Sequence, residues 1–184
     1  MNDLQTHKIR PEIIKALDEM GFKELFPIQN RVLEPLFSGR DVIAQSQTGT
    51  GKTAAFSIPM LERLNKNMGE VQALVLTPTR ELAVQVGKEI KKFGKYLGFN
   101  VAIVYGGQRI PLQIKVFKNK SIDIVVGTPG RIIDHLERRT FRLNATRIVV
   151  IDEADMMFDM GFKKDVEHIL DQTSVKRQIS LFSA

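Results

Sequence analysis

Hydrophobic residues gather in six short runs that recur along the chain. Within each run the apolar residues are largely consecutive instead of alternating with polar ones, which is typical of parallel strands covered on both faces. The pattern therefore predicts strands at residues 41–46, 73–77, 101–105, 122–127, 147–152 and 178–182.

Helical periodicity appears between these runs. Residues 80–97 place one apolar stripe opposite a row of lysines, and residues 11–20 repeat the pattern with Pro11 suited to a first helical turn. Strands that alternate with helices predict an α/β fold, a three-layer and mostly parallel doubly wound sheet. Ligands of such sheets bind beyond the carboxyl ends of the strands, so functional residues are expected there.

Length and composition narrow the class of protein. The 184 residues suit a single domain, 1–184, and the absence of cysteine excludes disulfides and thiolate metal sites. The first residues contain no apolar core typical of a signal peptide, and no apolar run approaches the roughly 20 residues that span a bilayer. We therefore expect a cytoplasmic protein without a membrane segment.

The net charge of +6 makes a polyanionic partner plausible, with nucleic acid favoured over anionic lipid. A basic protein without such a partner fits the charge equally well. The three histidines, His7, His135 and His168, show no ligand spacing, and we interpret them as surface or helix residues.

A glycine-rich loop, "SQTGTGKT" at residues 46–53, follows the first predicted strand and opens a helix. Glycine lets the backbone wrap a phosphate, whose charge the N–H groups and the helix start would stabilise. This is the Walker A pattern, with Ser46 where the simplest pattern has glycine. Lys52 would reach the β and γ phosphates of ATP, and the Thr53 hydroxyl would ligate Mg²⁺. The predicted ATP-binding residues of the loop are Ser46, Gln47, Thr48, Gly49, Thr50, Gly51, Lys52 and Thr53.

Two carboxylates end the fifth predicted strand. Asp152 is placed to hold Mg²⁺, directly or through water, and Glu153 to orient and deprotonate an attacking water. Adjacent carboxylates repel each other, and a divalent cation would relieve that repulsion. Lys52, Asp152 and Glu153 are the predicted catalytic residues.

Six short motifs follow one another along the chain. They are "GFKELFPIQ" at 21–29, "PTRELA" at 78–83, "GG" at 106–107, "TPGR" at 128–131, "DEAD" at 152–155 and "SA" at 183–184.

In their residues, order and spacing these motifs resemble the N-terminal RecA-like domain of a DEAD-box RNA helicase, over essentially the whole chain. The resemblance implies a Q-motif helical region at 1–40 and a P-loop core at 41–184 that ends within a Ser-Ala-Thr motif. The family's working unit has two RecA-like domains. A second domain would therefore supply the arginine fingers and half of the RNA-binding contacts, and the isolated domain is expected to be nearly inactive.

The resemblance also implies residue roles. Gln29 would select ATP through adenine, whose usual upstream aromatic partner is replaced by Leu4, and Phe22 is assigned to packing. Asp155, Ser183 and Ala184 would couple the nucleotide and RNA sites. Thr79 and Thr128 are expected to cap helices. RNA would be bound through phosphates and 2′-hydroxyls, without sequence preference, by Pro78, Thr79, Arg80, Gly106, Gly107, Thr128, Pro129, Gly130 and Arg131.

Two other functions fit the same residues. The Walker A loop and the acids also suit a DNA helicase or translocase module, and the fold also suits a non-catalytic nucleotide-binding fragment. The predicted activity is nonetheless an RNA-stimulated ATPase that unwinds short RNA duplexes or remodels RNA–protein complexes, with ATP and Mg²⁺ as cofactors.

Overall fold

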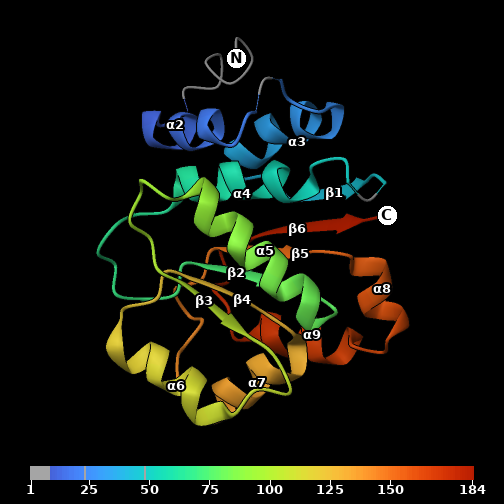
Figure 1. Ribbon diagram of the computed structural model, residues 1–184. Coiled ribbons are helices and arrows are strands. Elements are labelled where there is room, and N and C mark those ends of the chain that lie inside the picture. Colours follow the sequence, from blue (N-terminus) through green and yellow to red (C-terminus); the bar gives the residue numbers. More distant parts are fainter. Residues whose placement is uncertain (1–8, 23, 48) are drawn as a thin grey trace.

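The computed structural model describes residues 9–22, 24–47 and 49–184, and its centre is a parallel β-sheet (Figure 1). All six predicted strands are present, and every pairing between neighbours is parallel. Their order across the sheet is β1-β6-β5-β2-β4-β3. The strands are β1 (Val42–Gln45), β2 (Ala73–Leu76), β3 (Val101–Val104), β4 (Ile124–Gly127), β5 (Ile148–Ile151) and β6 (Gln178–Ser183).

Helices cover both faces of the sheet, which confirms the predicted three-layer arrangement (Figure 1). On one face pack α2 (Pro11–Glu19), α3 (Pro27–Phe37), α4 (Lys52–Arg63) and α5 (Arg80–Phe93). The other face packs against α6 (Ile110–Asn119), α7 (Pro129–Glu137), α8 (Ala154–Asp159) and α9 (Lys163–Asp171).

The central strands show why their apolar residues are consecutive. Every residue of β2, β4 and β5 is buried. Because successive side chains point to opposite faces, Ala73 and Val75 enter one core while Leu74 and Leu76 enter the other. The edge strand β1 is not buried on both faces, and Ile43 in this strand is 83% exposed.

The helix ends agree only partly with the sequence prediction. The Thr79 hydroxyl caps α5 by accepting a hydrogen bond from the Leu82 N–H at 3.2 Å, as predicted. The Thr128 side chain makes no such bond at the start of α7, so that predicted cap is wrong. The predicted helix 80–97 ends early, at Phe93, with Gly94 as the residue that follows it. Leu97 is buried nonetheless, because the following turn returns it to the core.

His135 lies in a helix, as predicted, but it is fully buried and does not lie at the surface. Its Nε2 lies 2.9 Å from the Gln113 side-chain oxygen, and its ring packs beside Phe117 and Phe141. Burial, reinforced by the positive charge of Arg131, lowers the pKa of His135 to about 4. The folded protein therefore holds this imidazole neutral.

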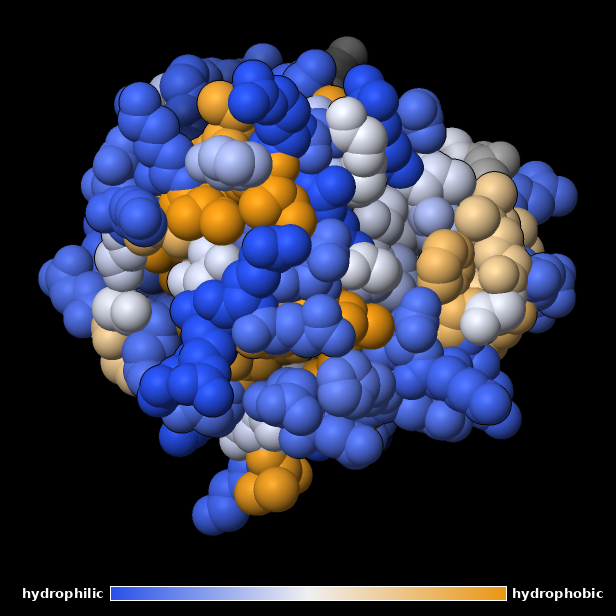
Figure 2. All heavy atoms as spheres, turned by 90° about the horizontal axis from the view of Figure 1, so that it is seen from below, coloured by the Kyte–Doolittle hydropathy of each residue, from blue (hydrophilic) through white to orange (hydrophobic). Residues whose placement is uncertain are grey.

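The surface seen from below is mostly hydrophilic, with apolar side chains gathered in separate patches (Figure 2). Two of the exposed large apolar residues, Leu112 and Val116, belong to α6. Within the described ranges, the helices are all too short or too polar to cross a membrane.

Gly127 in β4 and Gly130 in α7 differ in whether the surrounding structure leaves space for a side chain. A Cβ on Gly127 would lie 2.3 Å from the Val104 carbonyl oxygen in the neighbouring strand, whereas a Cβ on Gly130 would meet nothing within 4 Å. Gly127→Ala is expected to lower the free energy of unfolding by about 3 kcal/mol, because the backbone of β3 must shift. Gly130→Ala should raise it by about 0.5 kcal/mol, because alanine favours the helical state. Denaturant unfolding of both variants tests this, and equal effects would contradict it.

Protonation of His135 is expected to destabilise the fold in acid. The lowered folded-state pKa means that this contribution is complete above the unfolded value of 6.5 and is lost as the pH falls from there toward 4. Between pH 7 and 4.5 the wild type should lose about 2 kcal/mol more stability than His135→Gln, which cannot titrate. Arg131, Asp134 and Arg138, the charged groups that act on this imidazole, are retained in the variant. Parallel pH profiles for the two proteins would refute the assignment.

Candidate active site

The glycine-rich loop and the acidic turn meet at one edge of the sheet. Strand β6 lies between β1 and β5, and its residues pair level with both, Gln45 with Ser183 and Ile151 with Leu181. The loop after β1 and the turn after β5 therefore share a cavity of about 460 Å³. Six predicted residues line it, namely Gly49, Gly51, Lys52, Thr53, Asp152 and Glu153.

Lys52 is the buried cation of this cavity and the first residue of α4. Its ammonium donates to the carbonyl oxygens of Ser46 and Ser183, at 3.0 and 3.1 Å. It also forms an ion pair of 3.1 Å with Glu153. In this state the lysine thus neutralises the carboxylate that we predicted as the general base.

Asp152 lies deeper than Glu153 and is only 3% exposed. Its Oδ1 accepts a hydrogen bond from the Glu153 N–H at 3.1 Å. Burial raises the pKa of Asp152 to about 7, and the neighbouring Glu153 charge contributes in the same direction. Glu153 itself adopts a left-handed conformation, with φ of 50°, at the residue before α8. The site therefore concentrates negative charge where a cation would be most stabilising.

The loop conformation depends on Gly49 and Gly51, whose φ angles are 82° and 83°. Gly51 has a second constraint, because a Cβ there would lie 2.3 Å from the Gln29 amide nitrogen. Ser46 is not among the residues with positive φ, so this position tolerates a side chain.

Side-chain hydrogen bonds close the rest of the loop. The Ser46 and Thr50 hydroxyl oxygens lie 2.7 Å apart, and Thr50 donates to the Gln47 carbonyl at 2.7 Å. Thr48 lies outside the described residues, as does Leu4.

Gln29 is fully buried and does not line the cavity among the described residues. Its side-chain oxygen accepts the Phe26 N–H at 2.9 Å, and its side-chain nitrogen donates to the Gly51 carbonyl at 3.1 Å. The structure therefore connects Gln29 to the glycine-rich loop. Its predicted contact with adenine stays a prediction.

The three predicted RNA-binding motifs follow β2, β3 and β4, which are adjacent strands, so their loops lie at the same sheet edge. The Arg80 guanidinium lies over the Tyr105 ring, 5.2 Å from its centroid, next to Gly107. Arg131 donates to the Gln108 carbonyl at 2.8 Å. The two arginines are thus tied to one loop.

The residues of these three motifs differ in solvent exposure. Arg80, Gly106, Gly107 and Gly130 are exposed, whereas Pro78 and Pro129 are buried. The prolines can only shape their loops, while the exposed residues are accessible to a ligand.

The predicted coupling residues also converge. The Ala184 N–H donates to the Asp155 carboxylate at 3.3 Å. The Ser183 carbonyl accepts from Lys52, which links the end of β6 to the glycine-rich loop.

Sequence reasoning missed the far wall of the cavity. It consists of Met20, Phe22, Leu82, Gln85, Glu89, Lys92 and Phe93. Phe22 does pack edge-on against Phe93, with centroids 5.9 Å apart, yet it also faces the cavity. The signals for this wall were the packing assignment of Phe22 and the apolar stripe of α5, and neither identifies the polar members.

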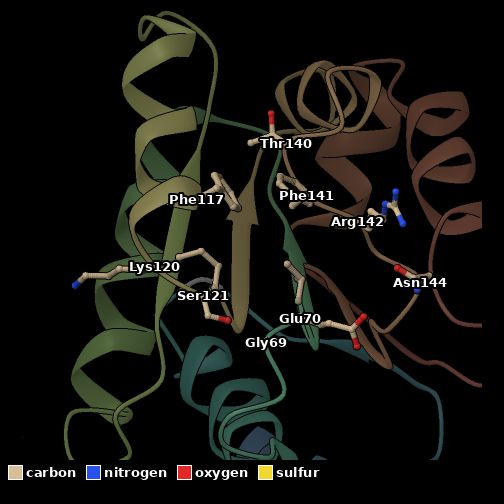
Figure 3. Close-up of a pocket in the computed structure, with 11 residues that line it drawn as sticks. Gly69, Glu70, Phe117, Lys120, Ser121, Thr140, Phe141, Arg142 and Asn144 are labelled. Atoms are coloured by element: carbon tan, nitrogen blue, oxygen red, sulfur yellow. The ribbon is translucent and has the colours of Figure 1, made fainter.

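A separate cavity of about 260 Å³ lies at the opposite end of the strands, beside residues that precede β2 and β4 (Figure 3). Phe117 and Phe141 stack on its wall with ring centroids 4.8 Å apart. The described residues that line it include none of the predicted site residues.

Comparison with solved structures supports the fold. A DEAD box protein from the hyperthermophile Methanococcus jannaschii superimposes with a TM-score of 0.90 and 43% identity, over 96% of this chain and 48% of that one. A hypothetical ATP-dependent RNA helicase from Sulfolobus tokodaii gives a TM-score of 0.86, also at 43% identity, over 96% of this chain and 51% of that one. Both similarities extend across the whole sheet.

Curated relatives agree in sequence. The chain is 49% identical to the DEAD-box ATP-dependent RNA helicase CshA of Geobacillus kaustophilus over all of its length, and 48% identical to that of Bacillus subtilis over 98%. It spans only 39% and 36% of those two proteins. The family model of the DEAD/DEAH box helicases matches residues 26–184 of the chain. With most of its length covered by that match, the chain belongs to the DEAD/DEAH box helicase family.

Proposed function

We propose that this chain is the N-terminal RecA-like domain of an ATP-dependent RNA helicase, which binds ATP and RNA. The whole protein would use ATP binding and hydrolysis to unwind short RNA duplexes or remodel RNA–protein complexes in the cytoplasm. The observation that carries the proposal is the shared cavity of the glycine-rich loop and the two carboxylates. The relatives named as RNA helicases favour RNA over DNA as the partner.

The residues present fit a magnesium ion. The Thr53 hydroxyl and the Asp152 carboxylate supply hard oxygen donors in one cavity, and the raised pKa of Asp152 marks a buried acid that a cation would stabilise in its charged form. Mg²⁺ typically takes its remaining ligands from water and substrate phosphates. Bound there, it would neutralise charge that develops on the phosphates.

Lys52 would change partners when a triphosphate is bound. Its ammonium now pairs with Glu153 and two carbonyl oxygens, and phosphate oxygens would replace the carboxylate. Glu153 would then be free to orient a water molecule and accept its proton. Adenine would lie toward the apolar end of the cavity, where Phe22 offers a ring face or edge. Gln29 would act by holding Gly51 in place.

RNA would lie across the loops after β2, β3 and β4. Arg80 is exposed and lies over the Tyr105 ring, so its charge is already positioned for phosphates. Arg131 is held by Gln108 and paired with Asp134, and a phosphate would replace that carboxylate. Hydrolysis would need a second RecA-like domain, whose arginine fingers are worth roughly 10³–10⁵ in rate at related sites. This division explains why little turnover is expected of the isolated chain.

Lys52→Ala is expected to weaken Mg·ATP binding at least about tenfold, because the phosphates lose a buried cationic partner. Isothermal titration calorimetry of this chain measures the affinity, and circular dichroism checks the fold. Lys118→Ala removes an exposed lysine from α6 and should leave binding unchanged. Equal affinity of the wild type and the Lys52 variant would remove the basis for the ATP site.

Glu153→Gln is expected to preserve nucleotide binding and to reduce RNA-stimulated ATP hydrolysis by at least about 10², since an amide cannot accept the proton of water. Hydrolysis is measured by phosphate release from the full-length protein, and binding by calorimetry. A parallel loss of binding and turnover would show that Glu153 holds the nucleotide instead of acting as a base.

A further inference from the structure

The sheet ends at β3, and the outer edge of this strand is open. Among the described residues β3 pairs only with β4. The carbonyls of Asn100 and Val104 accept hydrogen bonds from the β4 side, from Ile124 and Thr128. Because backbone groups alternate along a strand, those of Val101 and Ile103 point away from the sheet.

This open edge forms the floor of a groove of about 280 Å³. One wall is α5 and the other is α6, which lie on opposite sides of β3 (Figure 1). The lining residues are Val84, Lys91, Val101, Ala102, Ile103, Tyr105, Gln108, Leu112, Gln113 and Val116. The groove thus follows the length of one strand and has a helix on each side.

The groove lacks most of the features that prevent edge pairing. Residues 101–105, "VAIVY", contain no charge and no proline, and pairing is limited by the shortness of the strand and by the burial of Val101, Ala102 and Val104. Leu112 and Val116, one helical turn apart on α6, are 55% and 43% exposed. Such an apolar wall beside unpaired backbone is typical of strand-addition sites.

The two walls differ in charge. The α5 wall contributes Lys91, and the exposed Lys88 lies on the same helical stripe as Val84 and Lys91. On α6 the residues that line the groove, Leu112, Gln113 and Val116, are uncharged, and the two lysines of this helix do not line it. None of the ion pairs among described residues uses these lysines. The groove therefore complements negative charge on its α5 side and apolar side chains on its α6 side.

We propose that the β3 edge docks an extended segment of a partner protein in which apolar and acidic residues alternate. The segment would add to the sheet as a further strand, bonded to the outward backbone groups of Val101 and Ile103. Its side chains would point alternately toward α6 and α5, so the apolar residues would meet Leu112 and Val116 while the acidic residues meet Lys91.

Other occupants fit less well. A second copy of this chain would bring the same uncompensated lysines together. Single-stranded RNA would require exposed aromatic faces for stacking. The aromatic ring in the groove, Tyr105, already has the Arg80 guanidinium over its face.

The test uses labelled peptides of about eight residues, long enough to cover the strand. Fluorescence anisotropy compares alternating valine and glutamate with alternating valine and lysine. A third peptide keeps the acidic sequence but carries N-methyl groups on alternate residues. The acidic peptide should bind saturably, and both others at least about tenfold more weakly, because one loses charge complementarity and the other loses ladder donors.

Two variants locate the site on the protein. Leu112→Glu and Lys91→Glu should each weaken binding of the acidic peptide at least about tenfold. The control Val175→Glu places the same charge at a residue that is 93% exposed and precedes β6, four strands away from β3 in the sheet, and should leave binding within about twofold. Amide NMR shifts on peptide addition should centre on residues 101–105.

Three results would overturn the proposal. The first is no saturable binding, or binding that N-methylation and Leu112→Glu leave unchanged. The second is self-association of the chain that Leu112→Glu abolishes, which would assign the groove to a second copy. The third is RNA binding lost in the same variants without peptide binding, which would assign it to nucleic acid.

Discussion

The buried ammonium of Lys52 requires three strand ends to stay together. Its partners are the Ser46 carbonyl after β1, the Ser183 carbonyl at the end of β6 and the Glu153 carboxylate after β5. A buried charge costs several kcal/mol unless it is paired and hydrogen-bonded. The order β1-β6-β5 and the level register of these strands therefore determine whether the lysine is tolerated at all. The hydrogen bond from Lys52 to the Ser183 carbonyl joins residues that are 131 positions apart in the chain.

The same register extends this edge to the loops for which we propose RNA binding. Leu76, Gly127 and Val104 end β2, β4 and β3 at one level, so the loops that follow lie in one row. Asp152 joins the two halves, because its N–H donates to the Leu76 carbonyl at 2.9 Å while its carboxylate faces the cavity. The residues proposed to bind nucleotide and RNA are thus attached to one sheet, and a displacement of the acidic turn would reach the loop after β2 through a single hydrogen bond.

The sequence predicted most of this arrangement because its strongest signals are local. Consecutive apolar residues identify doubly covered strands, and the glycine-rich loop is specific for its strand–loop–helix setting. The predictions were wrong where contacts with residues distant in the sequence determine the local structure or burial. Leu97 continues the helical stripe but lies in a turn, and the burial of His135 beside Gln113 of another helix was not predicted. Thr128 occupies the cap position of α7 without a cap hydrogen bond, so a suitable residue type there does not ensure a cap.

The open edge of β3 differs from these sites because the chemistry it offers is backbone. The hydrogen bonds to β4 use the groups of alternate residues, so those of Val101 and Ile103 stay available without any cost to the sheet. The groove and the loops proposed to bind RNA nonetheless share one side chain. Tyr105 lines the groove, and Arg80 lies over its ring. A strand added along β3 as far as this residue would contact the ring that positions the arginine, so occupancy of the edge and the orientation of an RNA-facing charge are physically connected.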